Sequence, residues 1–345
     1  MSEGKPLITL GIMCYNLEKV IEETLESAFA QTYSPLEIVV SDNASDDRSW
    51  EVIQRVVAEY RSKPVEDGMP KHTVIINRNA RNLNIIGNLQ KIADISHGEF
   101  IVKLDGDDIA YPNRIEVIVD DWCRNNREAL MIAHSHVEFD GSLEYGGFKY
   151  GEGWDTWDER RRTGLLGDIP KSVTNGLYKR GHIGAVSAYH RKLFEAFPRF
   201  SFMGAMDDSL MQIRALMLGK IRTISEVLVK HRVGGFSMAK TITWRKRFCR
   251  TSHYVIDGDR QNLLDLEFVR PLMPKDMYDE MHKFLERKIC VLDAHVRLAE
   301  SDSLIERIGA FRKHHAYGLT KRDTVRAVIL LLFPNVFGDW LLSKI

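Results

Sequence analysis

Hydrophobic residues near the start of the chain alternate between short continuous runs and helical spacing. Residues 7–13 and 36–40 are apolar runs of strand length, whereas apolar positions recur every three or four residues over 17–29 and 50–60. A polar loop follows each strand-like run. The pattern predicts strands that alternate with helices, and therefore a mostly parallel sheet with helices on both faces.

The pattern continues along the chain with less regularity. Further strands are predicted at 73–76, 129–139 and 183–189, and further helices at 85–95, at 112–126 and from 205 to a stop at Gly219. Residues 140–180 are rich in glycine and include the basic run at 160–162, which indicates a long insertion over the sheet edge. Beyond Val233 the apolar spacing is mostly helical.

An acidic turn at the end of one buried run is the strongest candidate for chemistry. The strand 100–104 ends abruptly in Asp105, Gly106, Asp107 and Asp108. Open α/β sheets bind ligands at the carboxyl ends of their strands, and carboxylates together with substrate phosphates suit Mg²⁺ or Mn²⁺. Acidic triplets also occur as solvated turns. The buried strand that precedes the turn favours a metal site, because a metal site needs a rigid element to position its ligands and a solvated turn does not.

The loop after the second strand is also acidic. It runs from Ser41 to Asp47, and Ser45 is expected to cap the helix that follows, with Asp46 and Asp47 favourable against the helix dipole. We expect the loops after Met13, Val40 and Leu104 to lie along one edge of the sheet.

Composition narrows the class of protein. The 345 residues carry 48 basic and 48 acidic side chains, so no overall field favours nucleic acid, and none is expected as a partner. Four separated cysteines fit a reducing compartment, and no run is long enough for a transmembrane helix, so the protein is expected in the cytoplasm. Neither a G-x-G-x-x-G nor a P-loop motif is present, so side chains must hold any nucleotide.

Several motifs in order make the N-terminal two thirds resemble the GT-A glycosyltransferases of family 2, an inverting, bacterial surface-polysaccharide type. The motifs are Ile12-Met-Cys-Tyr-Asn16, Gln31-Thr-Tyr33, Val40-Ser-Asp-Asn-Ala-Ser-Asp-Asp47, Asn84-Ile-Ile-Gly-Asn88, His97-Gly-Glu-Phe-Ile101, Leu104-Asp-Gly-Asp-Asp108 with Pro112, and Met206-Asp-Asp208. The last hundred residues are outside the resemblance. It implies an α/β, Rossmann-like GT-A fold, to which the chain adds a helical C-terminal extension.

The resemblance also implies an activity. A family member of this kind moves a sugar from a nucleotide-diphosphate sugar, with a UDP-sugar favoured, to a glycan or lipid-linked glycan by single displacement with inversion, assisted by Mn²⁺ or Mg²⁺. The catalytic domain is expected at 1–235, with nucleotide-sugar binding over about 1–125 and the acceptor region over about 126–235. The helical region is expected at 236–345.

Site residues follow from the same motifs. Asp107 is expected to bind the metal, and Asp105 to reach a metal-bound water or the ribose. A general base must take the proton of the acceptor hydroxyl, and this role falls to Asp208 with Asp207 as its orienting neighbour. Two carboxylates in a first helical turn are favourable in any case, so this assignment depends on the resemblance. The expected substrate-binding residues are Tyr15, Asn16, Asp42, Asn88, Asp105 and Arg232.

The chain departs from the family pattern in two places. Where the family often has Arg-x-His, the chain has Arg232 followed by Val233 and Gly234, and His231 is the candidate replacement for the missing His. The acidic turn has Gly106 where Ala or Ser is commoner, which we expect to affect loop flexibility.

Two other functions remain open at this point. A nucleotidyltransferase also uses paired carboxylates and a metal, but it needs a basic, Gly-rich loop near the first strand, and residues 14–18 are neither basic nor Gly-rich. A catalytically silent sugar-binding or scaffold subunit is the other alternative, and the missing Arg-x-His is what favours it.

The C-terminal stretch 320–345 combines basic residues with the apolar run Ala327 to Phe333. It is expected either to pack against the core or a second subunit, which would make the protein a homo-oligomer, or to lie as a peripheral element at the inner membrane face.

Overall fold

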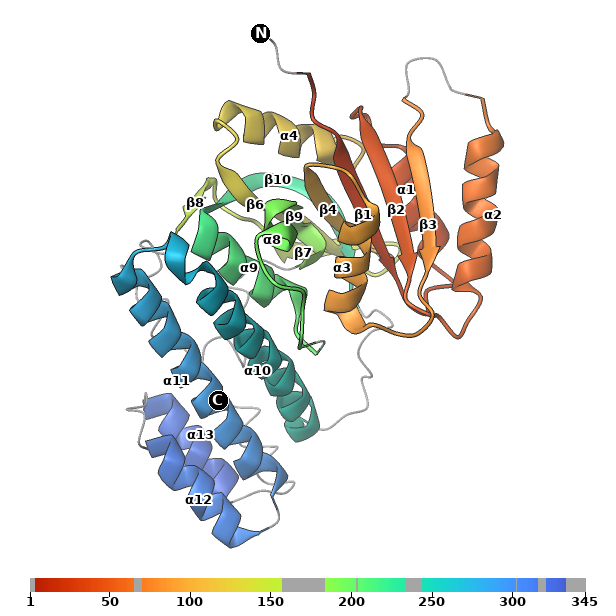
Figure 1. Cartoon of the computed structure of the whole chain (residues 1–345). Helices are drawn as coiled ribbons and strands as arrows, with labels where there is room; N and C mark the ends of the chain where they lie inside the picture. Colours follow the sequence, from red (N-terminus) through yellow and green to blue (C-terminus); the bar gives the residue numbers. More distant parts are fainter. Residues whose placement is uncertain are drawn as a thin grey trace. The chain divides into compact units, whose positions relative to one another are not determined.

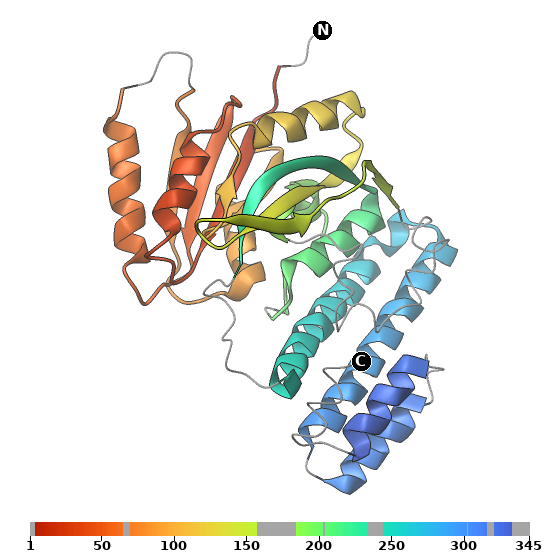
Figure 2. The same cartoon turned by 180° about the vertical axis from the view of Figure 1, so that it is seen from behind.

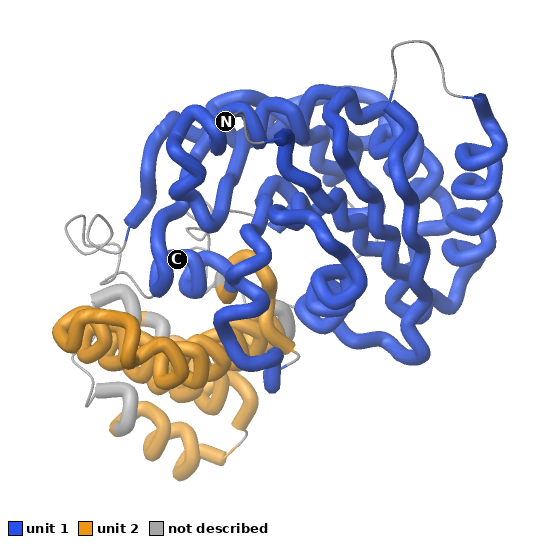
Figure 3. Tube along the Cα trace, turned by 45° about the horizontal axis from the view of Figure 1, so that its top comes forward, with its two compact units in different colours: residues 1–159, 182–203, 211–238 blue, residues 160–181, 204–210, 239–345 orange. Residues whose placement is uncertain are grey.

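The computed structural model describes residues 4–64, 70–156, 184–202, 204–233, 244–301, 303–315 and 321–332 (Figure 1). The chain divides into two compact units (Figure 3). Unit 1 comprises residues 1–159, 182–203 and 211–238, and unit 2 comprises 160–181, 204–210 and 239–345. The domain boundary expected near residue 235 stays a prediction.

Within the described residues, unit 1 is built on one sheet of ten strands. They are β1 (Ile8–Cys14), β2 (Leu36–Asp42), β3 (Thr73–Arg78), β4 (Phe100–Asp105), β5 (Ile109–Ala110), β6 (Ala129–Phe139), β7 (Glu144–Phe148), β8 (Gly153–Asp155), β9 (Ser187–His190) and β10 (Lys220–Arg232). The order along the main path is β3-β2-β1-β4-β9-β6-β10-β5, with β7 beside β6 and β8 beside β10. Figure 2 shows the same sheet from behind. The first four strands of this path are parallel, and β9 runs antiparallel between β4 and β6.

Helices cover both faces of the parallel strands, as the sequence predicts. Helices α1 (Ile21–Phe29), α2 (Ser49–Ser62) and α4 (Arg114–Arg124) bury apolar side chains with Ile8, Leu10 and Ile12 on one face. Helix α3 (Asn84–Ile95) covers the other face, where a Cβ at Gly11 would lie 2.8 Å from a methyl carbon of Ile92. This close approach explains a glycine in the middle of a buried strand.

The structure corrects two local expectations. The segment expected as a strand from 183 begins with a short 3-10 turn, Gly184–Val186, so that β9 starts only at Ser187. Ser45 does not cap α2, because that helix begins at Ser49 and the Ser45 hydroxyl donates instead to Asp42. Asp47 serves the helix start, since its carboxylate accepts a hydrogen bond from the Ser49 N–H at 2.9 Å.

Unit 2 contains the helical C-terminal part that the sequence predicts. Its long helices α10 (Trp244–Val269) and α11 (Lys275–Glu300) are joined by the 3-10 turn Arg270–Leu272, and α12 (Leu304–His315) and α13 (Lys321–Leu332) follow. Val255 and Ile256 of α10 pack with Leu292 and Val296 of α11. Among the described helices, none has the length and apolar character needed to cross a membrane.

Candidate active site

The carboxyl ends of three parallel strands bring the expected site residues of unit 1 to one edge of the sheet. In the strand register, Cys14 of β1 lies beside Asp42 of β2, and Met13 lies beside Asp105 of β4. The loops that carry Tyr15, Asp42 and the acidic turn therefore start side by side, at the edge where open α/β sheets bind ligands.

Backbone contacts hold the acidic turn tightly. The Gly106 N–H donates to the Met13 carbonyl at 2.8 Å, and the Thr24 hydroxyl donates to the Gly106 carbonyl at 2.9 Å. A Cβ at position 106 would lie 2.7 Å from the Met13 oxygen. The glycine is therefore explained by this close approach of two backbones, and not by the loop flexibility that the sequence analysis expects.

Each aspartate of the turn has different surroundings. The Asp105 carboxylate is one-third exposed and forms an ion pair with the buried Lys103 ammonium at 2.8 Å. Asp108 is fully buried, and it accepts hydrogen bonds from the Arg232 N–H at 2.8 Å and from His231, whose Nδ1 lies 3.1 Å away. Burial and the neighbouring Asp108 and Asp105 carboxylates raise the pKa of Asp107 to about 7. Burial also raises the pKa of Asp108, but Asp108 has His231 and Arg232 as partners, whereas Asp107 forms no ion pair among the described residues.

Arg232 braces the turn from β10. Its Nε donates to the Asp107 carbonyl at 2.9 Å, and its guanidinium forms an ion pair with Glu23 at 2.6 Å and lies over the Phe139 ring at 4.4 Å. His231 also contacts the turn through Asp108. Burial lowers the pKa of His231, but the hydrogen bond and charge of Asp108, with the charges of Asp105 and Asp107, raise it to about 9. Gly234, where the family's His is expected, lies outside the described residues.

The loops after β1 and β2 are joined to each other. The Asn16 N–H donates to the Ser45 hydroxyl at 2.9 Å, and the Asn16 side chain accepts from the Asp46 N–H at 2.8 Å. Asp42 is fully buried, and it accepts from Ser45 and lies 3.3 Å from the Arg78 guanidinium. Tyr15 is 44% exposed and is the expected base-stacking residue that faces solvent.

Asn88 lies beneath this loop in a polar network and is almost completely buried. Its side-chain oxygen accepts from the Ser41 hydroxyl at 2.7 Å and from Asn79 at 2.8 Å, and its amide donates to the Ser41 carbonyl at 3.1 Å. In this structure Asn88 fixes the end of β2, so any contact with substrate would be additional to that role.

The expected base and its neighbour begin another element. Asp207 and Asp208 are the first residues of helix α9 (Asp207–Leu218), and Asp207 is buried. Both belong to unit 2, whereas the acidic turn belongs to unit 1. Further along α9, the buried Arg214 donates to the carbonyls of Leu193 at 2.9 Å and Pro198 at 3.0 Å, which anchors the helix within unit 1.

Sequence reasoning misses two cations near the acidic turn. Lys103 is hidden in the apolar pattern of β4, although a lysine inside a buried run signals a nearby carboxylate. Arg114 at the start of α4 is fully buried and donates to the carbonyls of Lys103 at 2.8 Å and Ala185 at 3.1 Å. Burial lowers the pKa of Arg114 to about 9, while Asp108 and Asp105 favour its charge.

The chain is similar in sequence to known glycosyltransferases. The family model described as Glycosyl transferase family 2 matches residues 9–194, which is more than half of the chain. An uncharacterized glycosyltransferase of Haemophilus influenzae is 27% identical over 237 residues, covering 68% of this chain and 67% of the relative. The chondroitin synthase of Escherichia coli is 25% identical over 163 residues, covering 47% of this chain and only 21% of the relative.

Solved structures share the fold. S. aureus TarS, residues 1–349 in complex with UDP-GlcNAc, has a TM-score of 0.59 at 14% sequence identity, covering 98% of this chain and 90% of that one. The mannosyltransferase PcManGT from Pyrobaculum calidifontis, in complex with GDP-Man and Mn²⁺, has a TM-score of 0.51 at 16% identity, covering 99% and 87%.

Proposed function

We propose, from the premise that this chain belongs to glycosyl transferase family 2, that it is an inverting glycosyltransferase that uses a nucleotide-diphosphate sugar, with a UDP-sugar favoured. Family membership carries the proposal because it accounts for the acidic turn at the carboxyl edge of the sheet. The TarS and PcManGT complexes with UDP-GlcNAc and GDP-Man support a donor of this chemical class.

The donor set of the acidic turn fits a divalent cation held by Asp107 with Asp105. Among the described residues, no group of three or more His, Cys, Asp and Glu side chains is arranged to hold a metal. Mg²⁺ and Mn²⁺ characteristically take one or two carboxylates and complete their shell with water and substrate phosphates. The raised pKa of Asp107 indicates a carboxylate that lacks a counter-charge. When bound, the cation would neutralise the diphosphate leaving group.

The other groups have separate roles in the proposal. Asp208 takes the proton of the acceptor hydroxyl as the hydroxyl oxygen attacks the anomeric carbon of the donor sugar. The bond from that carbon to the nucleoside diphosphate breaks on the opposite face. Asp207 orients Asp208. Arg232 and His231 hold the turn against β10, and Tyr15 stacks on the base.

The acceptor is proposed to be a glycan or lipid-linked glycan of polysaccharide biosynthesis. The partial match to a chondroitin synthase supports this class. Because the match covers only 21% of that relative, the sugar and the linkage must be found by experiment. A silent sugar-binding subunit is the remaining alternative, because Gly234 replaces the family's His.

A donor screen tests the proposal. Thermal unfolding would be followed with UDP-, dTDP- and GDP-sugars, each with and without Mn²⁺. A donor at a hundred times its dissociation constant adds roughly 2.7 kcal/mol to the free energy of unfolding, which raises the unfolding temperature measurably. Stabilisation by one nucleotide together with slow hydrolysis of its sugar supports the enzyme. Stabilisation without hydrolysis by wild-type protein indicates the silent subunit, and no stabilisation by any donor contradicts both.

A further inference from the structure

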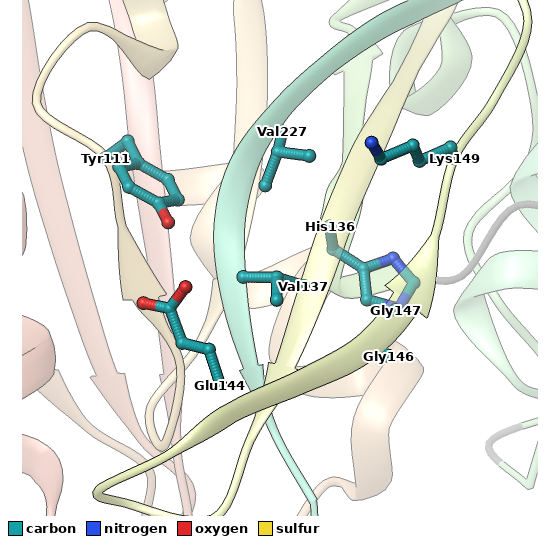
Figure 4. A pocket seen from close by; sticks show the side chains of 8 residues that line it. All are labelled: Tyr111, His136, Val137, Glu144, Gly146, Gly147, Lys149 and Val227. Atoms are coloured by element: carbon teal, nitrogen blue, oxygen red, sulfur yellow. The ribbon is translucent and has the colours of Figure 1, made fainter.

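A cavity of about 670 Å³ lies on unit 1 over β6, β7 and β10 (Figure 4). None of its lining residues belongs to the expected donor or metal site. The residues are Tyr111, His136, Val137, Glu144, Gly146, Gly147, Lys149 and Val227. Tyr111 and Glu144 lie on one side with their oxygen atoms toward each other, His136 and Lys149 lie on the other, and the two valines lie between them.

A β-bulge with two glycines shapes this cavity. The pairing of β6 with β7 is irregular between His136 and Glu138, and Gly146 and Gly147 both have positive φ, of 61° and 109°. A Cβ at Gly147 would lie 2.4 Å from the His136 carbonyl oxygen. Because both residues are glycines, the bulge exposes its backbone to the cavity. Bulges and glycines of this kind are common beside binding sites.

Polar groups in the cavity have unused hydrogen-bonding capacity. His136 is 6% exposed, and its Nδ1 is buried without a partner among the residues that the structure describes. Such a buried atom costs free energy unless a ligand or water satisfies it. Burial and the nearby His231 lower the pKa of His136 to about 4, so at neutral pH the imidazole is uncharged and can exchange a hydrogen bond with a hydroxyl.

The two ammonium groups nearest the cavity, those of Lys149 and Lys230, differ in their partners. Glu144 is neutralised by Lys230 at 2.5 Å, and that ammonium lies over the Tyr111 ring at 5.6 Å. Lys149 is exposed and forms no ion pair within the described part of the chain. An aromatic ring, a carboxylate, a neutral imidazole and a free ammonium around an apolar floor fit a ring with several hydroxyls and one negative charge.

We propose that this cavity is a second carbohydrate site, which binds an acidic sugar residue of a glycan independently of the nucleotide-sugar donor. Lys149 pairs with the sugar carboxylate, His136 and Glu144 bind its hydroxyls, and Tyr111 covers one face of the ring. The cavity adjoins the surroundings of the acidic turn, since the His136 ring packs edge-on against the His231 ring at 5.6 Å.

The test uses two sugars that differ only at C6, methyl β-glucuronide with a carboxylate and methyl β-glucoside with a hydroxymethyl group, and sodium acetate as a carboxylate without a ring. Binding would be measured by saturation-transfer NMR on the full chain. The glucuronide should bind about tenfold more tightly than the glucoside, as expected for one charge-assisted contact, and acetate more weakly than either sugar. Equal binding of the two sugars, or acetate binding as tightly as the glucuronide, overturns the proposal.

Variants locate the site. Lys149→Glu should remove the preference for the glucuronide, and Tyr111→Ala should weaken both sugars, whereas Lys192→Glu, an equal charge change on an exposed lysine of the same unit, should alter neither. Asp107→Asn should bind the glucuronide as wild type does, so failure of the metal assignment would not be confused with failure here. Competition of UDP and Mn²⁺ with the glucuronide, or unchanged binding in Lys149→Glu, would contradict a separate site.

Discussion

At the residue scale, three aspartates within four positions have three different environments. Asp105 is paired with Lys103, and Asp108 is bonded to His231 and Arg232. Burial raises the pKa of both Asp107 and Asp108, that of Asp107 to about 7, but Asp107 has no ion pair among the described residues. The two outer carboxylates are therefore held by the protein, and the middle one is the position at which an external cation would be most stabilising. We infer that this division of roles, and not the count of carboxylates, marks the metal position.

The base assignment gives the first prediction. Asp208→Asn should leave donor binding nearly intact and reduce sugar transfer by about 10²–10⁴-fold, because a general base acts only on the proton of the acceptor. Transfer and donor affinity would be measured on the same preparation, with Asp207→Asn beside it. A larger loss in Asp207→Asn would identify the wrong carboxylate, and unchanged transfer in both variants would remove the pair from the mechanism.

The buried carboxylate of Glu37, which is outside the candidate active site, gives a prediction about stability. Glu37 of β2 accepts hydrogen bonds from the Thr9 hydroxyl at 2.6 Å, from the Gly98 N–H at 2.9 Å and from the His97 N–H. Burial alone would raise the pKa of Glu37, but these hydrogen bonds to the charged form lower it below its ordinary value. Glu37→Gln should lower the free energy of unfolding by about 1–3 kcal/mol at pH 7, because a charge-assisted cluster is weakened.

The pH dependence of this effect has a definite sign. Because the pKa of Glu37 is lower in the folded state than its unfolded value of about 4.3, the stabilisation is fully present above that pH and is lost as the pH falls through the folded pKa. Urea unfolding of wild type and Glu37→Gln at pH 7 and at successively more acidic pH measures the difference, with the exposed Glu51→Gln as control. A difference that stays constant with pH would contradict the assignment.

The site could be predicted from sequence only where chain order and strand ends determine it. Strand ends placed Tyr15, Asp42 and Asp105 at one edge, because parallel strands share a direction. Nothing in the local pattern indicates that Asp42 is paired with Arg78 of β3, or that Asn88 is enclosed by Ser41 and Asn79, since these partners come from other elements. Hydrophobic periodicity predicts local structure, and it does not predict which residues from distant elements meet in a hydrogen bond.

At the element scale, prediction succeeds where most of a run of residues is buried. The strand predicted at 129–139 is β6, Ala129–Phe139, which begins with five apolar residues and stays buried through His134, Ser135 and His136. The insertion at 140–180 is harder, since β8 pairs with β10, which is distant in sequence, and residues 157–183 lie outside the described part. The glycine-rich bulge of β7 has no signature beyond its two glycines.

The last two helices carry a prediction about membranes. Helix α13 buries Ala327 and Leu330 in a core with Phe248 and Leu298, while its other face is exposed. The exposed apolar side chains of α12 and α13 are Leu304, Ile305, Ile308, Val325, Val328 and Leu332. From 304 to 332 the sequence has six Lys and Arg residues against two acidic ones, a balance that suits an anionic lipid surface. Residues 333–345 of the expected membrane segment lie outside the described residues.

We expect the full-length protein to float with anionic vesicles at low salt and to be released as salt screens the basic residues. The triple change of Val325, Val328 and Leu332 to Ser should reduce flotation without unfolding the protein, because those side chains are exposed. Leu143→Ser, at an exposed apolar residue of unit 1, is the matched control. If the triple variant instead changes only the oligomeric state by light scattering, a second subunit covers this face and the membrane hypothesis is wrong.

At the scale of the whole molecule, the chain joins a family-wide sheet to a helical region that the family model does not match. The matched residues 9–194 include the three strand ends and the acidic turn, whereas Asp207, Asp208 and every residue of α10 to α13 follow them. Donor chemistry is therefore the part of the account that rests on shared sequence. The acceptor must be found by experiment.

The central claim is that the acidic turn binds a metal together with the donor's diphosphate, and UDP affinity tests it most directly. Calorimetric titration of UDP would be made with Mn²⁺, with EDTA, and with the variants Asp107→Asn and Asp120→Asn, the second an exposed aspartate of α4. Because the protein offers the ion only one or two carboxylates, metal and nucleotide should bind interdependently, and Mn²⁺ alone should bind weakly. EDTA and Asp107→Asn should each weaken UDP binding, and Asp120→Asn should not. UDP affinity unchanged by both EDTA and Asp107→Asn would contradict a metal site in the acidic turn.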